Sequence, residues 1–446
     1  MNKIRNLYEQ LRSYPSAFAG IAIIVLMVCV AIYSMIAIPY EEVVRLWRGG
    51  ENVWLETPRN ARPAWINYFR KDKLPETITL KTTEDPSLKT VVPLGGGVST
   101  SDMVFTFDYH YDGFPSELSM FFTSTYNSAR PNVSIKWITP DGREIRLTDM
   151  TIRTSESYRI SQDNAVSRRV GGLAPEVGLF ADPNDPTKVN KGTYQVVVEG
   201  LVFEEDSNLE GTLVVYGQVH GMAGTDHRRR DIMVALLWGT PVALSFGLLA
   251  AVGSSLTTML LAAAAVWFGG WVDSAIRRIN EIVMILPLLP ILIMVGLFYS
   301  RSIWAILGVV ILLGIFGSGI LTYRSMFLQV KESGYIDAAR AYGASSGRII
   351  LRYMIPKVIP VLIPQFVAQV PNYVFLEATL AVLGLGDPVL PTWGKLLNDA
   401  YTNGALFTGH YYWVLEPAFL LVITGLGFAM LGFALDRIFN PRLRGL

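Results

Sequence analysis

Few residues of this chain have the types and spacing that catalysis needs. Its histidines form no HExxH motif and no pair at helical spacing; they are His110, His220, His227 and His410. No GxSxG nucleophile motif and no GxxxxGK[ST] phosphate loop occurs. Because the single cysteine, Cys29, lies in a long apolar run, an intrachain disulfide and a cysteine-based metal site are both excluded. The sequence therefore predicts a protein that is not an enzyme and uses no cofactor, and any nucleotide that powers it must bind to another chain.

The segment Tyr335–Pro356 has residue types suited to protein docking instead. It reads YIDAARAYGASSGRIILRYMIP and lies between long uncharged runs. Small alanine side chains allow a short helix to press closely against a partner, Gly343 permits a tight turn, and Pro356 is expected to fix where the next helix begins. Nearby arginines are suited to acidic groups on the partner; they are Arg340, Arg348 and Arg352. The alternative is a solvated basic loop, which charge alone would favour.

Composition predicts that the elements around this segment cross a membrane. The chain has 446 residues, of which 51% are hydrophobic and only 17% charged, and its mean hydropathy is +0.35. Six uncharged stretches are each long enough to cross a hydrocarbon core of about 30 Å. They lie between Arg12 and Glu41, Asp231 and Asp273, Glu281 and Arg301, Arg301 and Arg324, Lys357 and Glu377, and Glu416 and Asp436. The predicted fold class is an α-helical polytopic membrane protein with six transmembrane helices.

The positions of the cations predict an orientation. Lysines and arginines gather before the first span, between the second and third, between the fourth and fifth, and after the sixth. The positive-inside rule then places both termini in the cytoplasm of a multi-pass cell-membrane protein. Three arginines, 228–230, fall on the outer side, where a flat interfacial helix would let them reach lipid headgroups. The predicted segments are a cytoplasmic N-terminal segment (1–16), a first transmembrane helix (17–39), an extracytoplasmic domain (40–224), an interfacial helix (225–237) and a five-helix core (238–446) with the cytoplasmic coupling loop 324–356.

The outer domain is predicted to be β-rich and sandwich-like. From Met103 to Tyr111, aromatic and polar residues alternate strictly, as in a half-buried strand. Residues 133–138 and 144–150 flank the turn Pro140-Asp141-Gly142, which indicates a hairpin. Acidic residues outnumber basic ones in this domain, whereas basic residues prevail in the rest of the chain. That split favours two compartments.

Other parts of the outer domain allow more than one interpretation. Residues 194–203 and 211–219 are expected to pair with each other across a polar loop. Residues 173–191 are expected to form a surface loop, and a calcium site there is the lesser alternative because the carboxylates lack an ordered ligand spacing. Four aromatic residues are expected to pack in the core or anchor at an interface, rather than bind a sugar or peptide; they are Trp54, Trp65, Tyr68 and Phe69.

Several motifs together resemble one family, the C-type permease subunits of dipeptide and oligopeptide ABC importers (the DppC/OppC group). The resemblance is weak over residues 1–40 and strong over 224–446. Its motifs are Gly224-Thr225-Asp226 with Arg230-Asp231, Gly269-Gly270-Trp271-Val272-Asp273, Asp337-Ala338-Ala339 with Gly343 and Ile355-Pro356, Leu383-Gly384-Leu385-Gly386, Thr392-Trp393-Gly394, and Asn440-Pro441-Arg442-Leu443-Arg444. Arg229 stands where the family pattern has glycine, and Asp337 stands where it has glutamate.

This resemblance implies a half-channel of an importer-type ABC permease. Its expected partners are a second homologous permease subunit, two cytoplasmic ATPase subunits, an extracytoplasmic substrate-binding protein and membrane lipid, but no nucleic acid. The implied coupling residues are Asp337, Ala338, Ala339, Arg340, Gly343, Ala344, Ile355 and Pro356. Closure of the ATPases would move the coupling helices as levers, and the fifth span would bend at its internal prolines, Pro360, Pro364 and Pro371.

Substrate and pathway remain open at this stage. Peptides are the family's majority substrate, and oligosaccharides are the alternative. Asn372 and Glu377 are candidate pathway residues because an intramembrane carboxylate usually faces the bundle or a wet path; a structural bond to a neighbouring helix is the alternative for Glu377. A membrane-anchored binding or sensor protein is a second function class, which needs fewer spans, and an ion-coupled carrier is a third. The outer domain exceeds the family's usual connection, so we expect its removal to weaken docking of the binding protein.

Overall fold

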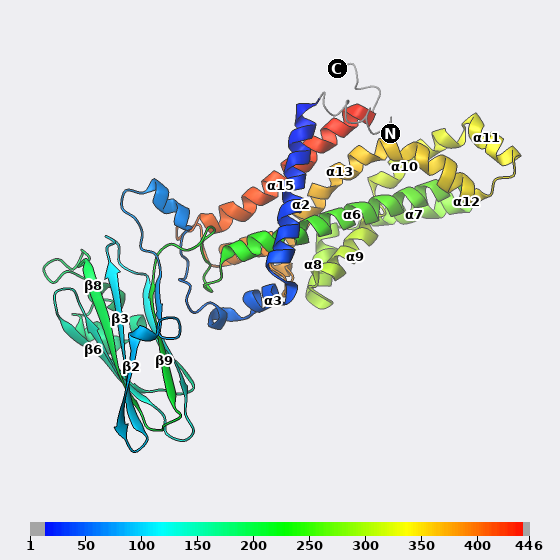
Figure 1. Cartoon of the computed structure of the whole chain (residues 1–446). Helices are drawn as coiled ribbons and strands as arrows, with labels where there is room; N and C mark the ends of the chain where they lie inside the picture. The colour runs from blue at the N-terminus through cyan, green and yellow to red at the C-terminus, as the bar shows by residue number, and fades with distance from the viewer. Residues whose placement is uncertain (1–13, 440–446) are drawn as a thin grey trace. The chain divides into compact units, whose positions relative to one another are not determined.

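The computed structural model describes residues 14–439, which form two compact units (Figure 1). One unit contains residues up to 48 and from 234 onward, and the other contains residues 49–233. The second unit therefore begins and ends nine residues later than the predicted outer domain, 40–224. The reason lies in helix α3 (Tyr40–Arg48), which buries Val43 and Trp47 and belongs with the helical unit.

The first unit is helical, as predicted. Its long helices are α2 (Pro15–Ala37), α6 (Ile232–Phe268), α13 (Ile355–Leu380) and α15 (Tyr412–Phe439). Its shorter helices are α7 (Gly270–Ile285), α8 (Leu288–Phe298), α9 (Ile303–Gly314), α10 (Ser318–Lys331), α11 (Gly334–Ala341), α12 (Ser346–Arg348) and α14 (Trp393–Thr402). Four helical stretches among the described residues are long and apolar enough to cross a membrane, and six spans result if α7 with α8 and α9 with α10 are each one bent span.

Small residues bring the first and last of these spans together. A Cβ atom on Gly20 of α2 would lie 2.7 Å from the carbonyl oxygen of Gly427 on α15, and a Cβ on Gly427 would lie 2.7 Å from Cγ2 of Ile23. A side chain on Gly20 would meet backbone atoms of α15, and a side chain on Gly427 would require the Ile23 side chain to move. Close backbone approach of this kind is a common way to pack helices in lipid, where apolar burial gives little driving force between them. The predicted first span, 17–39, corresponds to α2.

The predicted interfacial helix over 225–237 is wrong as a separate element. Residues 225–231 form a tight loop closed by a bridge between Thr225 and Asp231, and α6 starts directly at Ile232. The loop forms because the Asp226 carboxylate accepts hydrogen bonds from the backbone N–H groups of Arg228 (2.8 Å) and Arg230 (2.9 Å), which a helix would have used otherwise.

The second unit contains two antiparallel sheets with one shared core. One sheet has the order β1-β9-β4-β7 and the other β2-β3-β8-β5-β6 (Figure 1). The strands are β1 (Ile78–Lys81), β2 (Lys89–Gly95), β3 (Val98–Tyr109), β4 (Glu117–Thr125), β5 (Asn132–Ile138), β6 (Glu144–Thr151), β7 (Ser155–Tyr158), β8 (Gly192–Val202) and β9 (Asn208–Tyr216). Alternate residues of β3 are buried in the core, as the aromatic alternation predicted; they are Met103, Phe105, Phe107 and Tyr109. The predicted hairpin is present as β5 and β6.

The expected pairing of residues 194–203 with 211–219 is wrong. Both segments are strands, but β8 pairs with β3 and β5, whereas β9 pairs with β1 and β4 in the other sheet. The polar loop between them crosses from one sheet to the other. Its Glu204 carboxylate accepts hydrogen bonds from the backbone of Asn127, Ser128 and Ala129, which lowers the pKa of Glu204 to about 2. These hydrogen bonds of Glu204 hold the loop in a conformation that leads from one sheet to the other, so β8 and β9 do not form a hairpin.

Residues 173–191 are also more than a surface loop. The segment contains the short helix α5 (Pro175–Gly178) and inserts Leu179 and Phe180 into the core, both fully buried. The Phe180 ring packs on Tyr109 and Tyr194, each at 4.6 Å between ring centroids, and on Trp137 at 5.3 Å. No group of three histidine, cysteine or acidic residues suited to a metal ion occurs among the described residues. The aromatic centre of the core thus depends on a residue from a long connection.

We expect Phe180→Ala to destabilise this unit by about 3–5 kcal/mol, because a fully buried aromatic ring would leave a cavity among rigid neighbours. Thermal unfolding of the full-length protein, followed by tryptophan fluorescence, measures the effect. The matched control is Leu94→Ala on β2, where the side chain is 61% exposed and the change should be near zero. Equal melting curves for the two variants would contradict the packing role of Phe180.

Candidate functional site: the docking helix and its supports

The predicted docking segment contains a short helix, α11, with two different faces. Ile336 and Ala339 are buried, whereas Asp337, Ala338 and Arg340 face outward. Figure 1 shows α11 at one tip of the helical unit, next to α10 and α12. The two consecutive alanines therefore have different environments: Ala339 packs inward and Ala338 lies on the exposed face.

Gly343 ends α11, as its predicted turn requires. The backbone N–H of Gly343 donates to the Arg340 carbonyl (2.9 Å), and the N–H of Ala344 donates to the Ala339 carbonyl (3.0 Å). These two bonds form a Schellman cap, in which the residue after the helix adopts a left-handed conformation. Gly343 has φ +73°, which glycine adopts at no steric cost. Tyr342, immediately before it, is 92% exposed.

An apolar core holds the inner face of α11. Ile336 and Ala339 pack in one cluster with residues of α6, α10 and the start of the next long helix, including Ala263, Phe327 and Met354. The Arg340 guanidinium lies over the Trp267 ring of α6, with 4.5 Å between Cζ and the ring centroid. Arg340 is therefore partly engaged within the chain, although its side chain is 46% exposed. Helix α11 is therefore fixed to the end of α6.

Two ionic contacts fix the helix that leads into α11. The Arg324 guanidinium of α10 donates two hydrogen bonds to the Asp273 carboxylate of α7, both 2.7 Å. The Lys331 ammonium donates to the carbonyl of Val266 (2.7 Å) near the C-terminal end of α6, where a cation is favoured by the helix dipole. The glycine pair that precedes Trp271 separates α6 from α7 and has positive φ at both residues, +62° and +51°. The Gly-Gly-Trp-Val-Asp motif thus places the Asp273 carboxylate where it can accept hydrogen bonds from Arg324 of α10.

Pro356 is the second residue of α13 (Ile355–Leu380), close to the predicted helix start, but it does not mark the beginning of all helical structure. Helical structure starts at Ser346 and continues through a π-helical turn, Ile349–Met354, into α13. A proline lacks the N–H donor and its ring crowds the carbonyl four residues earlier, and a π turn widens the backbone at that place. Ile355 is buried and Pro356 is exposed.

The two predicted pathway residues point to different places. Asn372 is exposed and lines a groove of about 750 Å³ between α13 and α15, together with Gln365 and Asp436. Glu377 is 94% buried, since its exposed fraction is 6%, and borders a space of only about 10 Å³ beside Asp387. The structure therefore does not bring Asn372 and Glu377 together.

A polar cavity of about 350 Å³ was missed by sequence reasoning. It lies among α6, α7, α9, α10 and α13, and its polar lining includes Ser254, Ser255, Thr258, Tyr323, Gln369 and Tyr373. Ser254 Oγ and the Tyr373 hydroxyl are 2.9 Å apart, and Thr258 Oγ1 donates to the Ile315 carbonyl (2.8 Å). The sequence signal for this cavity is the group of small polar residues Ser254, Ser255 and Thr258 within the uncharged run of α6. Charge alone does not reveal it.

The motifs Leu383–Gly386 and Thr392–Gly394 determine where α14 lies, and they do not position a reactive group. Gly384 leaves the helical conformation (φ +87°), and the chain then returns to α14, whose Thr392 side chain accepts from the Lys395 N–H (3.2 Å). The Trp393 indole donates to the Leu236 carbonyl (3.0 Å) and fills the space beside Gly239 of α6. Residues 440–444, the last motif, lie outside the described residues.

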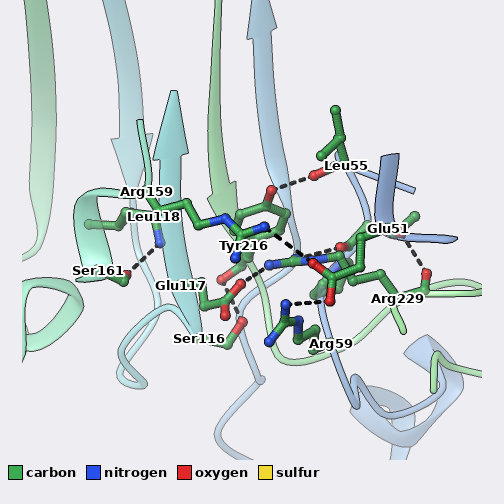
Figure 2. Close-up of polar contacts among 12 residues, drawn as sticks. Glu51, Leu55, Arg59, Ser116, Glu117, Leu118, Arg159, Ser161, Tyr216 and Arg229 are labelled. Carbon is green, nitrogen blue, oxygen red and sulfur yellow. Dashed lines mark hydrogen bonds and ion pairs between the residues drawn. The ribbon is translucent and has the colours of Figure 1, made fainter. Parts of the chain in front are cut away.

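Within the β unit, Arg229 joins the loop before α6 to strands β4 and β9 (Figure 2). The buried Arg230 and Asp226 side chains form an ion pair of 2.6 Å. The Arg229 guanidinium forms an ion pair with Glu117, donates to the Thr57 carbonyl (2.8 Å) and lies 4.4 Å from the centroid of the Tyr216 ring. Arg229 occupies the left-handed region with φ +66°, the conformation for which glycine is best suited.

We expect Arg324→Gln to loosen α10 and α11, because it removes both hydrogen bonds to the Asp273 carboxylate. Hydrogen bonds to charged groups contribute about 1.5–3 kcal/mol, so amide hydrogen exchange over residues 318–344 should accelerate by roughly tenfold or more. The matched control is Arg278→Gln, where an 80% exposed side chain pairs with Glu281 at 3.3 Å and should contribute little. If amide hydrogen exchange over residues 318–344 is the same in the two variants, the ion pair between Arg324 and Asp273 does not hold α10 and α11 in place.

Comparisons with known proteins show the family of this chain. Residues 236–445 match the family described as binding-protein-dependent transport system inner membrane component. The chain is 30% identical to the dipeptide transport system permease protein DppC of Bacillus subtilis (strain 168) over 222 residues, which is 50% of this chain and 68% of the relative. It is 29% identical to the oligopeptide transport system permease protein OppC of the same organism, over 50% of this chain and 72% of the relative. The glutathione transport system permease protein GsiD of Pectobacterium atrosepticum is 28% identical, again over 50% and 72%. The chain therefore belongs to the inner-membrane components of binding-protein-dependent transport systems and is a DppC/OppC-like permease.

Proposed function

We propose that this chain is the non-catalytic translocation subunit of an ATP-driven importer for peptides, and that α11 is where an ATPase subunit docks. The observation that carries the proposal is the division of α11 into a buried face and an outward face of Asp337, Ala338 and Arg340. A solvated basic loop would not need a capped helix seated in an apolar core. The substrate class rests on the names of the relatives, which transport dipeptides, oligopeptides and glutathione.

Force would pass from α11 into the membrane through packed side chains. Ile336 and Ala339 belong to the same core as Phe327 of α10 and Ile355 of α13, so a displacement of α11 would carry these helices along. Close-packed interiors transmit displacement rather than absorb it. Of the predicted coupling residues, we propose that Asp337, Ala338 and Arg340 contact the ATPase. Ala339, Gly343, Ala344, Ile355 and Pro356 would shape and seat the helix.

The proposed arrangement in the membrane has six spans, with α7 and α8 forming one bent span and α9 and α10 another. Both termini would lie in the cytoplasm, and residues 49–233 would form an extracytoplasmic β-sandwich. A second permease subunit, a second ATPase subunit and a binding protein would complete the importer. Support comes from the cation distribution of the sequence and from the single core shared by the two sheets.

The polar cavity beside Ser254 and Tyr373 is the proposed lining of the translocation path within this subunit, because its hydroxyl and amide groups could replace water around a peptide. Asn372 stays a candidate on the separate groove between α13 and α15. For Glu377 we propose a structural role, since its side chain is buried and borders a space of only about 10 Å³.

We expect Ala338→Arg to block ATPase docking without unfolding the chain, because this side chain points outward from α11. The measurement is co-purification of the ATPase subunits with the tagged permease and peptide uptake by the assembled importer, both of which should fall by about tenfold. Gln329→Arg is the matched control, because it also turns a neutral residue into an arginine at an exposed position, near the end of α10, and should leave both readouts unchanged. Normal co-purification of Ala338→Arg would sink the docking proposal.

The β unit can be removed at a point that the structure makes convenient. The Gly217 N–H donates to Thr77 Oγ1 (3.1 Å), so residues 78–216 can be replaced by a short glycine-serine linker. Arg229 would lose both Glu117 and Tyr216, and the deletion should therefore carry Arg229→Gly as well. The control is Arg229→Gly in the full-length chain. We expect the shortened permease to assemble with its ATPases but to bind the binding protein about tenfold more weakly; unchanged affinity would refute this role of the β unit.

A further inference from the structure

Four apolar side chains of the β unit stand exposed in one place. Tyr68 is 88% exposed, Phe69 83%, Met222 73% and Trp65 45%. Trp65 and Phe69 meet edge to face, with 6.2 Å between ring centroids, and the Trp65 indole donates to the Met222 carbonyl (3.0 Å). We call these four residues the aromatic patch. Of the two expectations for these aromatics, core packing is wrong for Trp65, Tyr68 and Phe69, and anchoring at an interface stays a prediction.

The patch is held outward by the structure beneath it. Its rings lie on a 3₁₀ helix, Ala64–Phe69, and the loop that follows is closed by two reciprocal hydrogen bonds between Asn67 and Leu74: the Asn67 amide donates to the Leu74 carbonyl (3.0 Å), and the Leu74 N–H donates to Asn67 Oδ1 (2.9 Å). Leu74 itself is buried. The exposed rings are therefore presented by an ordered loop, with the core already filled behind them.

A short chain of hydrogen bonds connects the patch to the start of a candidate membrane span. The Ala64 N–H donates to the Gly221 carbonyl (2.9 Å), the Gly224 N–H donates to the His220 carbonyl (3.1 Å), and the Ile232 N–H donates to the Gly224 carbonyl (3.1 Å). Ile232 is the first residue of α6 and is itself part of the β unit. The patch therefore lies at the end of this unit where its chain enters an apolar helix of 37 residues.

The charges around the patch match a phospholipid headgroup. A groove of about 550 Å³ lies beside the rings, and its lining includes Lys73 and Glu76. A lysine suits the phosphate and a glutamate suits the ammonium of a zwitterionic headgroup. Arg70 and Lys71 are also exposed, next to the single acidic residue Asp72. Tryptophan and tyrosine are the side chains that membrane proteins concentrate at headgroup depth.

We propose that the aromatic patch inserts into the headgroup layer of the membrane from which α6 emerges, with Lys73 and Glu76 holding the phosphate and ammonium of one phospholipid. This inference goes beyond transport, because it assigns the β unit a lipid contact of its own. It does not depend on α11 or on the ATPases. A protein or peptide ligand on the patch is the competing occupant, and the experiment below separates the two.

The test places a fluorescent label at Tyr68→Cys in full-length protein carrying Cys29→Ser, which removes the single native cysteine. The protein is reconstituted alone in nanodiscs of phosphatidylethanolamine and phosphatidylglycerol. A nitroxide on the lipid headgroup should quench this label about threefold more than the same label at Leu94→Cys, an exposed apolar position on β2. Equal quenching at the two positions would overturn the proposal.

A charge substitution tests the headgroup contact separately. Lys73→Glu should reduce quenching of the Tyr68→Cys label, because it places an anion where the phosphate would bind. Lys188→Glu makes the same change of charge at another exposed lysine of the unit and should have no effect. If the label is protected from aqueous iodide only after binding protein or peptide is added, and never by lipid, the patch is a protein-docking site and the proposal fails.

Discussion

The ion pair between Asp273 and Arg324 is the constraint on which the position of α11 depends. It joins the beginning of α7 to α10 through two hydrogen bonds of 2.7 Å, and α11 follows α10 after a two-residue break. The pair is only partly exposed, with 12% of the Asp273 and 27% of the Arg324 side chain accessible, so water screens it less than a surface pair. Burial of Ile336 contributes about 1.5–3 kcal/mol, which is similar to the contribution of hydrogen bonds to a charged group. Apolar burial, however, has no preferred direction. The ion pair therefore fixes the orientation of α10 and α11, and the apolar core fixes how deeply α11 is buried.

Local sequence patterns predicted most of the individual strands and helices, but they did not predict which strands pair with each other. Aromatic alternation in β3 correctly indicated which face is buried, because side chains of a strand alternate between two faces. The same alternation in β8 and β9 carries no information on which strand lies beside each, and the Glu204 anchor that sends them to different sheets joins residues far apart in the sequence. Phe180 was assigned to a loop for a related reason, since a single buried ring has no periodicity.

The candidate site shows the same division. Gly343 was predicted correctly from its residue type because a left-handed cap favours glycine in any surroundings. Pro356 lies at the start of α13 as predicted, but the buried residues before it, such as Ile350 and Met354, keep the chain helical through a π turn that no local rule anticipates. The polar cavity could not be predicted from charge, since its hydroxyl groups already satisfy part of their hydrogen bonding within their own helices, as Ser254 does with the Ala250 carbonyl (2.6 Å).

Arg229 makes the loop before α6 depend on two strands of the β unit. A residue with φ +66° bears a backbone strain that glycine would avoid, and a buried guanidinium without an anion would cost several kcal/mol more. Both burdens are acceptable only because Glu117 and Tyr216 are present, and both belong to the β unit. A substitution at Glu117 or Tyr216 would leave this guanidinium without its partners, so these three positions, far apart in the sequence, are constrained together.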